Sequence, residues 1–188
     1  MTIPGPSGNS PVLSTVGTGA YNGAELTADL IQAQIQANIS QALANVRSYR
    51  QNPIVTTEPP REYFQYEVFV RAYRCPAIFV IIQDMDLREA QIGQNHINAS
   101  IRATVAAVVE DRKESLLIDK AWRYQAALQQ CLHHVSLTTA DGALRLFSRV
   151  KRCQFSGIIN LKDEKAPDAV FRKEMSLQLT VDHIENFV

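Results

Sequence analysis

The stretch "INASIRATVAAVVEDRKESLLIDKAWRYQAALQQC", Ile97–Cys131, contains a single change of hydrophobic period. In its first part every second residue is small or apolar, the pattern of a β-strand with one buried face. After Arg112 the apolar residues recur every three or four positions, the pattern of an amphipathic helix. The strand positions are Ile97, Ala99, Ile101, Ala103, Val105, Ala107 and Val109, and the helix positions are Leu117, Ala121, Tyr124, Leu128, Cys131 or Leu132, and Val135. The stretch therefore predicts a strand that runs directly into a helix.

Charged residues crowd the point where the period changes, in "EDRKE" from Glu110 to Glu114. Carboxylates at a helix N-terminus are stabilised by the positive end of the helix dipole, and Asp111 or Ser115 is a suitable cap. An acidic cluster can also hold a hard cation, but Arg112 and Lys113 interrupt this one, and such ions need several convergent oxygens. We interpret the cluster as a strand-to-helix junction.

The predicted strand is long for a chain of this size. Fully extended, Ile97 to Val109 spans roughly 40 Å. We expect part of this strand to project from the subunit and to need a neighbour to cover it.

A second helical pattern precedes this strand. From Glu25 to Arg50 the apolar residues recur at helical spacing, and Pro53 follows. The stripe consists of Ile31, Ile35, Ile39, Leu43 and Val46, and Asn22 with Glu25 is a plausible capping pair. The preceding residues, 1–23, are rich in Gly, Pro, Ser and Thr, which predicts a flexible N-terminal arm.

Three further strands complete the expected fold. The β-branched run Ala77–Ile82 predicts a strand covered on both faces, which Asp84, Asp86 and Arg88 close. Two strands end the chain, Phe147–Ile159 and Phe171 to about Ile184, joined by the polar loop "KDEKAPDA". The predicted order is α-β-β-α-β-β: an α+β fold with two main helices flanking a mostly antiparallel sheet, in one domain over residues 24–188.

Composition narrows the function classes. The 188 residues carry 19 basic and 19 acidic side chains, so no overall field favours nucleic acid or an anionic membrane. The N-terminus lacks the pattern of a secretory signal, and apolar runs such as "PAIFVII" are too short to span a bilayer. Cys75, Cys131 and Cys153 are odd in number and lie among apolar neighbours, so we expect buried free thiols.

Motifs of enzyme chemistry are weak. The sequence contains no G-x-S-x-G elbow and no glycine-rich phosphate loop of the Walker or Rossmann form. Cys131, His133 and His134 in "CLHH" invite a zinc hypothesis, but their spacing matches no usual zinc motif. We therefore predict no catalytic residues, no metal and no cofactor. A small metal-dependent hydrolase using residues between Asp111 and His134 is the distant alternative.

Three sets of residues are candidates for contacts with partners. An aromatic set is either core packing or an interface, since Tyr and Phe are enriched in interfaces. A basic set on "RLFSRVKRC", where Arg149 and Lys151 share one strand face and Arg152 lies on the other, meets either an acidic protein surface or DNA phosphates. The candidates are Tyr63, Phe64, Tyr66, Phe69 and Tyr73 in the aromatic set, Glu110, Asp111 and Arg112 at the junction, and Arg149, Lys151 and Arg152 in the basic set, with Arg145 nearby.

The order of these elements and several local motifs resemble one family. The motifs are "PP…AYRCPAIFVIIQD" after the first helix, "VVEDR" leading into "RYQAALQQCL", then "CQFSG" and "FRKEMSLQLTVDHIE" in the last strands. From Glu25 to Phe187 the chain resembles the tail terminator and related neck proteins of tailed bacteriophages. The arm before Asn22 lies outside the resemblance.

The resemblance implies a structural protein without catalytic residues. In that family a small α/β subunit forms a six-membered ring that caps the tail tube, stops its growth and docks to the head connector. It implies a homohexamer in the virion neck, assembled in the host cytoplasm. Its partners would be the tail tube protein, a sheath protein where one exists, and the head-tail connector. DNA would pass through the channel without being read. A head-tail connector or stopper ring is the alternative within the same class.

Overall fold

The computed structural model describes residues 23–46, 57–65, 73–89, 96–139, 145–161 and 170–186. The helices are α1 Gly23–Asn45 and α2 Glu114–Leu132. The strands are β1 Glu62–Phe64, β2 Ala77–Glu89, β3 His96–Asp111, β4 Val135–Thr138, β5 Arg145–Leu161 and β6 Val170–Asn186. The predicted α+β class is confirmed. The two helices and four long strands occur in the predicted order, and the short strands β1 and β4 are additional.

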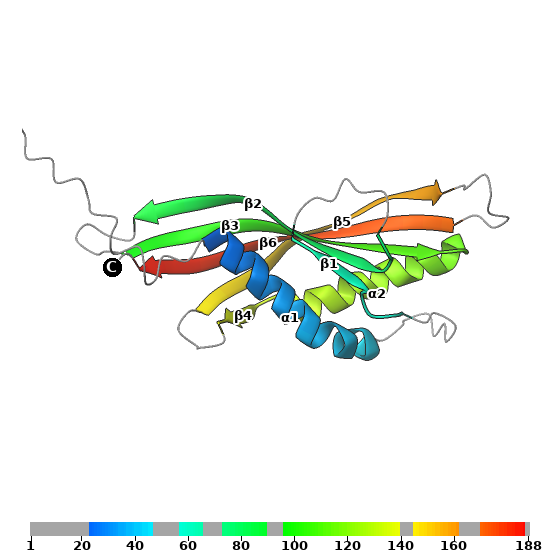
Figure 1. Ribbon diagram of the computed structural model, residues 1–188, viewed down its shortest axis with the longest axis horizontal. Helices are drawn as coiled ribbons and strands as arrows, with labels where there is room; N and C mark the ends of the chain where they lie inside the picture. The colour runs from blue at the N-terminus through cyan, green and yellow to red at the C-terminus, as the bar shows by residue number, and fades with distance from the viewer. Residues whose placement is uncertain are drawn as a thin grey trace, which may run out of the picture.

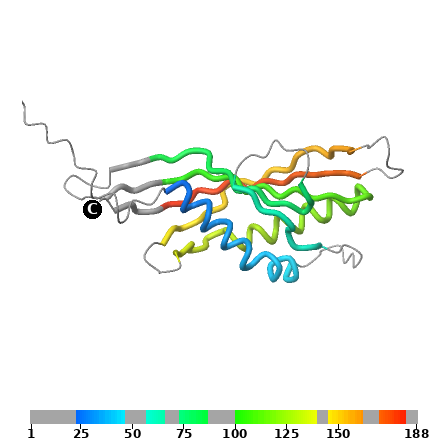
Figure 2. Tube along the Cα trace, in the orientation of Figure 1, coloured from blue at the N-terminus to red at the C-terminus, as the bar shows by residue number. Residues whose placement is uncertain are grey.

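The strands form one sheet in the order β1-β2-β3-β6-β5-β4. Strand β1 is parallel to β2, and every other neighbouring pair is antiparallel, so the sheet is mostly antiparallel as predicted. Both helices lie on one side of the sheet (Figure 1). The sheet twists so strongly that β2 is the uppermost strand at one end of the view and β5 at the other (Figures 1 and 2).

The main core lies between the helices and one face of the sheet, the helix face. Helix α1 contributes the fully buried Ile31, Ile35 and Ile39, each of which stabilises the fold by about 1.5–3 kcal/mol through burial. Between the helices, Gln34 Nε2 donates a hydrogen bond to the Cys131 carbonyl oxygen at 3.2 Å. The strands contribute Ile78, Val80, Ile101, Ala103, Val105, Ala107, Val109, Met175, Leu177, Leu179 and Val181.

A smaller apolar cluster covers part of the opposite face, here called the back face. Ala77 and Phe79 of β2 and Ala106 and Val108 of β3 are buried there. Because Ile78 and Val80 belong to the main core, the start of β2 is covered on both faces, as predicted.

Strand β2 continues beyond the predicted end. A register shift between Ile82 and Asp84 absorbs one residue, after which β2 remains paired with β3 from Asp84 opposite Arg102 to Glu89 opposite Ile97. The prediction that Asp84, Asp86 and Arg88 close the strand is therefore wrong. Asp84 and Asp86 are exposed, so the pairing continues without burying a charge.

Helix α2 ends earlier than the apolar pattern indicates. His133 is extended (φ −85°, ψ 122°), and His134 has φ 58°, so the chain leaves the helix and enters β4. Val135, which was predicted as the last apolar position of this helix, is the first residue of β4. Neither α1 nor α2 is long and apolar enough to cross a membrane.

Some predictions lie outside the described residues. Gly23, predicted as the end of the arm, is the first residue of α1. Residues 1–22, including the capping candidate Asn22, are not among those described, so the flexible arm stays a prediction. The polar loop "KDEKAPDA" between β5 and β6, residues 162–169, also lies outside the described residues.

Candidate assembly surfaces

Asp111 fastens the start of α2 to the end of β3. Its Oδ1 accepts a hydrogen bond from the Lys113 backbone N–H at 2.9 Å, and its Oδ2 lies 2.6 Å from Lys120 Nζ. Although partial burial alone would raise it, the pKa of Asp111 is lowered by the bonds from Lys120 and the Lys113 amide. The prediction that Asp111 or Ser115 caps the helix is wrong, because the N-cap residue is Lys113, and Asp111 instead binds the Lys113 amide. The residue that precedes the helix, Lys113, makes no side-chain capping bond.

Glu110 points to the back face and pairs with Arg172 directly across the strand. Arg172 Nε donates to Glu110 Oε1 at 2.7 Å. The guanidinium carbon of Arg172 lies 4.6 Å from the centre of the Tyr73 ring, and Arg172 Nη1 donates to the Tyr73 hydroxyl at 3.3 Å. Arg172 thus joins the predicted junction to the predicted aromatic set.

The aromatic set is divided between the two faces. Phe64 stacks on Phe79 at 5.0 Å between ring centres, and Tyr73 meets Phe79 edge to face at 5.3 Å, all on the back face. Tyr63 instead packs against the main core. Tyr66 and Phe69 lie outside the described residues. For Tyr63, Phe64 and Tyr73, packing within the subunit is observed, and an additional role in an interface stays a prediction.

The basic set lies on β5 and is exposed. The β5–β6 register places Arg149 opposite Thr180 and Arg152 opposite Gln178, with a shift between Val150 and Arg152. This bulge makes Lys151 the extra residue and returns Arg152 to the back face beside Arg149. The predicted separation of Arg152 from Arg149 is therefore wrong.

The basic side chains differ in their partners. Arg149 lies 3.9 Å from Asp182 and 5.1 Å from the centre of the Phe147 ring. Lys151 and Arg152 form no ion pair with any described residue. Arg112, at the junction, is exposed. The positive charges of Lys151 and Arg152 are thus available to a partner on β5.

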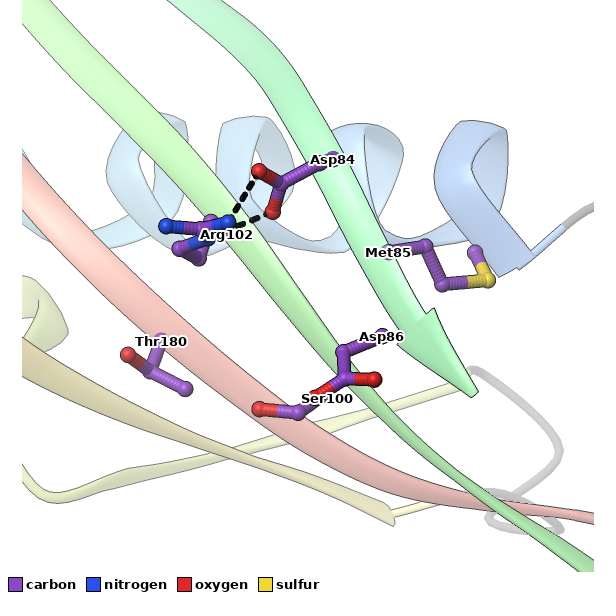
Figure 3. A pocket seen from close by; sticks show the side chains of 6 residues that line it. All are labelled: Asp84, Met85, Asp86, Ser100, Arg102 and Thr180. Atoms are coloured by element: carbon purple, nitrogen blue, oxygen red, sulfur yellow. Dashed lines mark hydrogen bonds and ion pairs between the residues drawn. The ribbon is translucent and has the colours of Figure 1, made fainter. Parts of the chain in front are cut away.

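An open, polar depression of about 380 Å³ lies on the back face near the far end of β2 (Figure 3). Arg102 of β3 and Asp84 of β2 form an ion pair across it at 2.5 Å. Asp86 and Ser100 lie on the same side, and Ser100 Oγ donates to Asp182 Oδ1 at 2.9 Å. The arrangement is that of an exposed, charged sheet surface.

The thiols form no disulfide, and the rings of His133 and His134 lie side by side with their centres 4.1 Å apart. Cys131 is buried, whereas Cys75 and Cys153 are half-buried, and all three are free, so full burial holds only for Cys131. Burial raises the pKa of Cys75 to about 12 and that of Cys131 to about 11, which disfavours the reactive thiolate. Within the described ranges, no three His, Cys, Asp or Glu side chains gather as metal ligands.

Among the described strands, the sheet has two open edges. On one side, β1 pairs only with Ala77–Phe79 of β2. On the other side, β4 pairs only with Arg145–Ser148 of β5. Beyond these points no described strand pairs with the outer edge of either long strand, and the two open stretches lie at opposite ends of the sheet (Figure 1). The sequence alone did not reveal them, because hydrophobic periodicity does not give the order of strands.

No family model matches the sequence, and no curated protein matches it. Among solved structures the chain is similar to one from an assembly described as "Virion of native gene transfer agent (GTA) particle". The TM-score is 0.40 and the sequence identity 14%, and the match covers 82% of this chain and 98% of that chain.

Proposed function

We propose that this chain is a structural protein of a phage-like virion and assembles with copies of itself into a ring in the neck. Within that class we propose a tail terminator, which caps the tail tube and joins it to the head-proximal neck. A head-tail connector or stopper ring is the second candidate.

The observation that carries the proposal is the pair of open edges on β2 and β5. An open edge presents a row of unpaired N–H and C=O groups, and soluble proteins normally cover or shorten such edges. Here two long edges differ in sequence and lie at opposite ends of one sheet, so each suits a contact with a different surface of another copy. A head-to-tail interface of this kind closes into a ring when the rotation that relates one copy to the next is a whole fraction of a full turn.

The element order and the family resemblance support the terminator within this class. The exposed basic residues of β5 then face an acidic neighbour or the DNA that passes through the channel. Under this proposal, charge reversal at Arg112 or Arg149 weakens assembly while leaving the far-UV circular dichroism spectrum unchanged. Normal assembly in both variants would remove them from the interface.

Electron microscopy of tail tubes tests the terminator function. Tube protein from the same virus is polymerised with and without the purified chain, and tube lengths and ends are compared. We expect short tubes that carry a ring at one end when the chain is present. Rings that never bind tubes but bind the head connector would favour the second candidate. Failure to bind either would contradict both.

A further inference from the structure

We infer that the open edge of β2 in one subunit pairs antiparallel with the open edge of β5 in the next. This inference rests on the proposed ring and names the surface that would form it. The occupant of each edge is therefore a second copy of this chain.

Strand directions make this pairing continuous with the subunit's own sheet. The four long strands alternate in direction in the order β2-β3-β6-β5. Because their number is even, copies that share one orientation about a ring axis place β5 antiparallel to the neighbouring β2. Where β5 of one copy lies beside β2 of the next, residues whose side chains point to the same face of the sheet can also direct their backbone N–H and C=O groups toward each other.

The charges of the two edges are complementary. Beyond the part that β4 and His133 cover, β5 carries Lys151 and Arg152 and no acidic residue. Beyond the part that β1 covers, the described side chains of β2 include the acids Asp84 and Asp86. Opposite charges on facing strands stabilise the pair, whereas two β5 edges or two β2 edges would repel.

The obstructions at each end restrict the register. His133, just before β4, covers the next part of the β5 edge. Its Nδ1 accepts a hydrogen bond from the backbone N–H of Val150 in β5 at 3.3 Å, so this amide cannot pair with another strand. Strand β1 occupies the edge of β2 up to Phe79. No other described strand pairs with the outer backbone edge of β2 from Val80 to Glu89 or of β5 from Lys151 to Leu161.

Among the registers that keep side chains on matching faces, we infer the one that combines an opposite-charge pair with apolar pairs. It places Asp86 opposite Arg152 on the back face. On the helix face it places apolar residues opposite one another, covering Phe155, which is 42% exposed in the single subunit. These pairs are Met85 with Cys153, Ile82 with Phe155 and Val80 with Ile158.

The same register is compatible with ring closure. It displaces each subunit along the strands by about four residues, or roughly 13 Å. Four strand spacings of about 4.8 Å separate equivalent strands of adjacent copies. The ratio of the displacement along the strands to the four strand spacings across them corresponds to a strand tilt of about 35°. This is the lower end of the range of about 35–45° found in closed barrels.

Charge exchange between the facing residues tests the pairing. In Asp86→Arg and in Arg152→Glu alone, we expect the Kd of self-association to rise about tenfold, because like charges then face each other. The double variant carries the exchanged pair and should recover most of the lost affinity. Arg145→Glu is the matched control, because Arg145 pairs with β4 and lies outside the shared stretch, and it should leave the Kd unchanged.

Disulfide trapping tests the register directly. With Cys153→Ser as background, Asp86→Cys combined with Arg152→Cys should give a ladder of covalent oligomers under oxidation, whereas each single cysteine should not. If wild-type rings form but neither charge exchange nor trapping has an effect, the edge pairing is wrong and the proposed ring stands. If the wild-type chain never associates, both are wrong.

Discussion

At the scale of single residues, Asp111 shows how a charged cluster serves the fold. It binds the Lys113 amide and Lys120, so its carboxylate joins the end of β3 to the first turns of α2. An acid in this position requires no metal and no catalytic role to account for it. The sequence reasoning identified the junction correctly because a helix N-terminus favours a carboxylate.

Asp111→Asn should lower the free energy of unfolding by about 1 kcal/mol at pH 7. The pKa of Asp111 in the folded state lies below its ordinary value of 3.8, so its contribution to stability is present above pH 3.8 and is lost as the pH falls through the folded-state pKa. Urea denaturation at pH 7 and pH 3 should therefore show a smaller difference between variant and wild type at pH 3. The control, Glu114→Gln, alters an exposed acid of the same turn. An equal difference at both pH values would contradict this role.

Arg172 is a residue that sequence reasoning missed, because nothing in an alternating strand marks which polar residue meets an aromatic ring. Its side chain is 19% exposed and that of Glu110 27%, so removing one leaves the other partly buried without its partner. Arg172→Met should lower the free energy of unfolding by about 2 kcal/mol. A double-mutant cycle with Glu110→Gln should give a coupling of about 1 kcal/mol or more. Additive losses would mean that the pair does not stabilise the back face.

At the scale of elements, α1 depends on its apolar stripe more than on its own helical propensity. Ile35→Ala should lower the free energy of unfolding by about 3 kcal/mol, because it opens a cavity between α1 and the sheet. Gln36→Ala, on the exposed side of the same turn, should change it by less than about 0.5 kcal/mol. Urea denaturation measures both, and equal effects would show that the stripe is not the main contact.

The elements that the sequence predicts are those with a long, clean period. Helices α1 and α2 and strand β3 follow directly from the spacing of Ile, Leu, Ala and Val. Strands β1 and β4 have three and four residues, too few to show a period. Bulges were not predictable either, because one inserted residue resets the alternation, as it does at Lys151. This is why the faces of the basic set were assigned incorrectly while its strand was correct.

At the scale of the whole molecule, the two open edges on which the ring proposal rests result from the order of the strands in the sheet. The sequence predicted that the long strand β3 needs a neighbouring subunit to cover it, but β2 and β6 of the same subunit pair with it along nearly its whole length. Periodicity could not show that β2 and β5 would form the two edges. The aromatic set was predicted as either core or interface, and Phe64 and Tyr73 lie in a back-face cluster within the subunit. The proposed assembly edges thus lie on β2 and β5, and of the predicted sets only the basic set lies on one of these strands.

Native mass spectrometry of the purified chain at micromolar concentration tests the central claim most directly. The account predicts one closed assembly whose mass is a fixed multiple of the 21.0 kDa chain, six-fold if the family resemblance holds, and which dissociates as salt screens the acidic and basic edges. A chain that remains monomeric at low salt and at the highest concentration reached would contradict it.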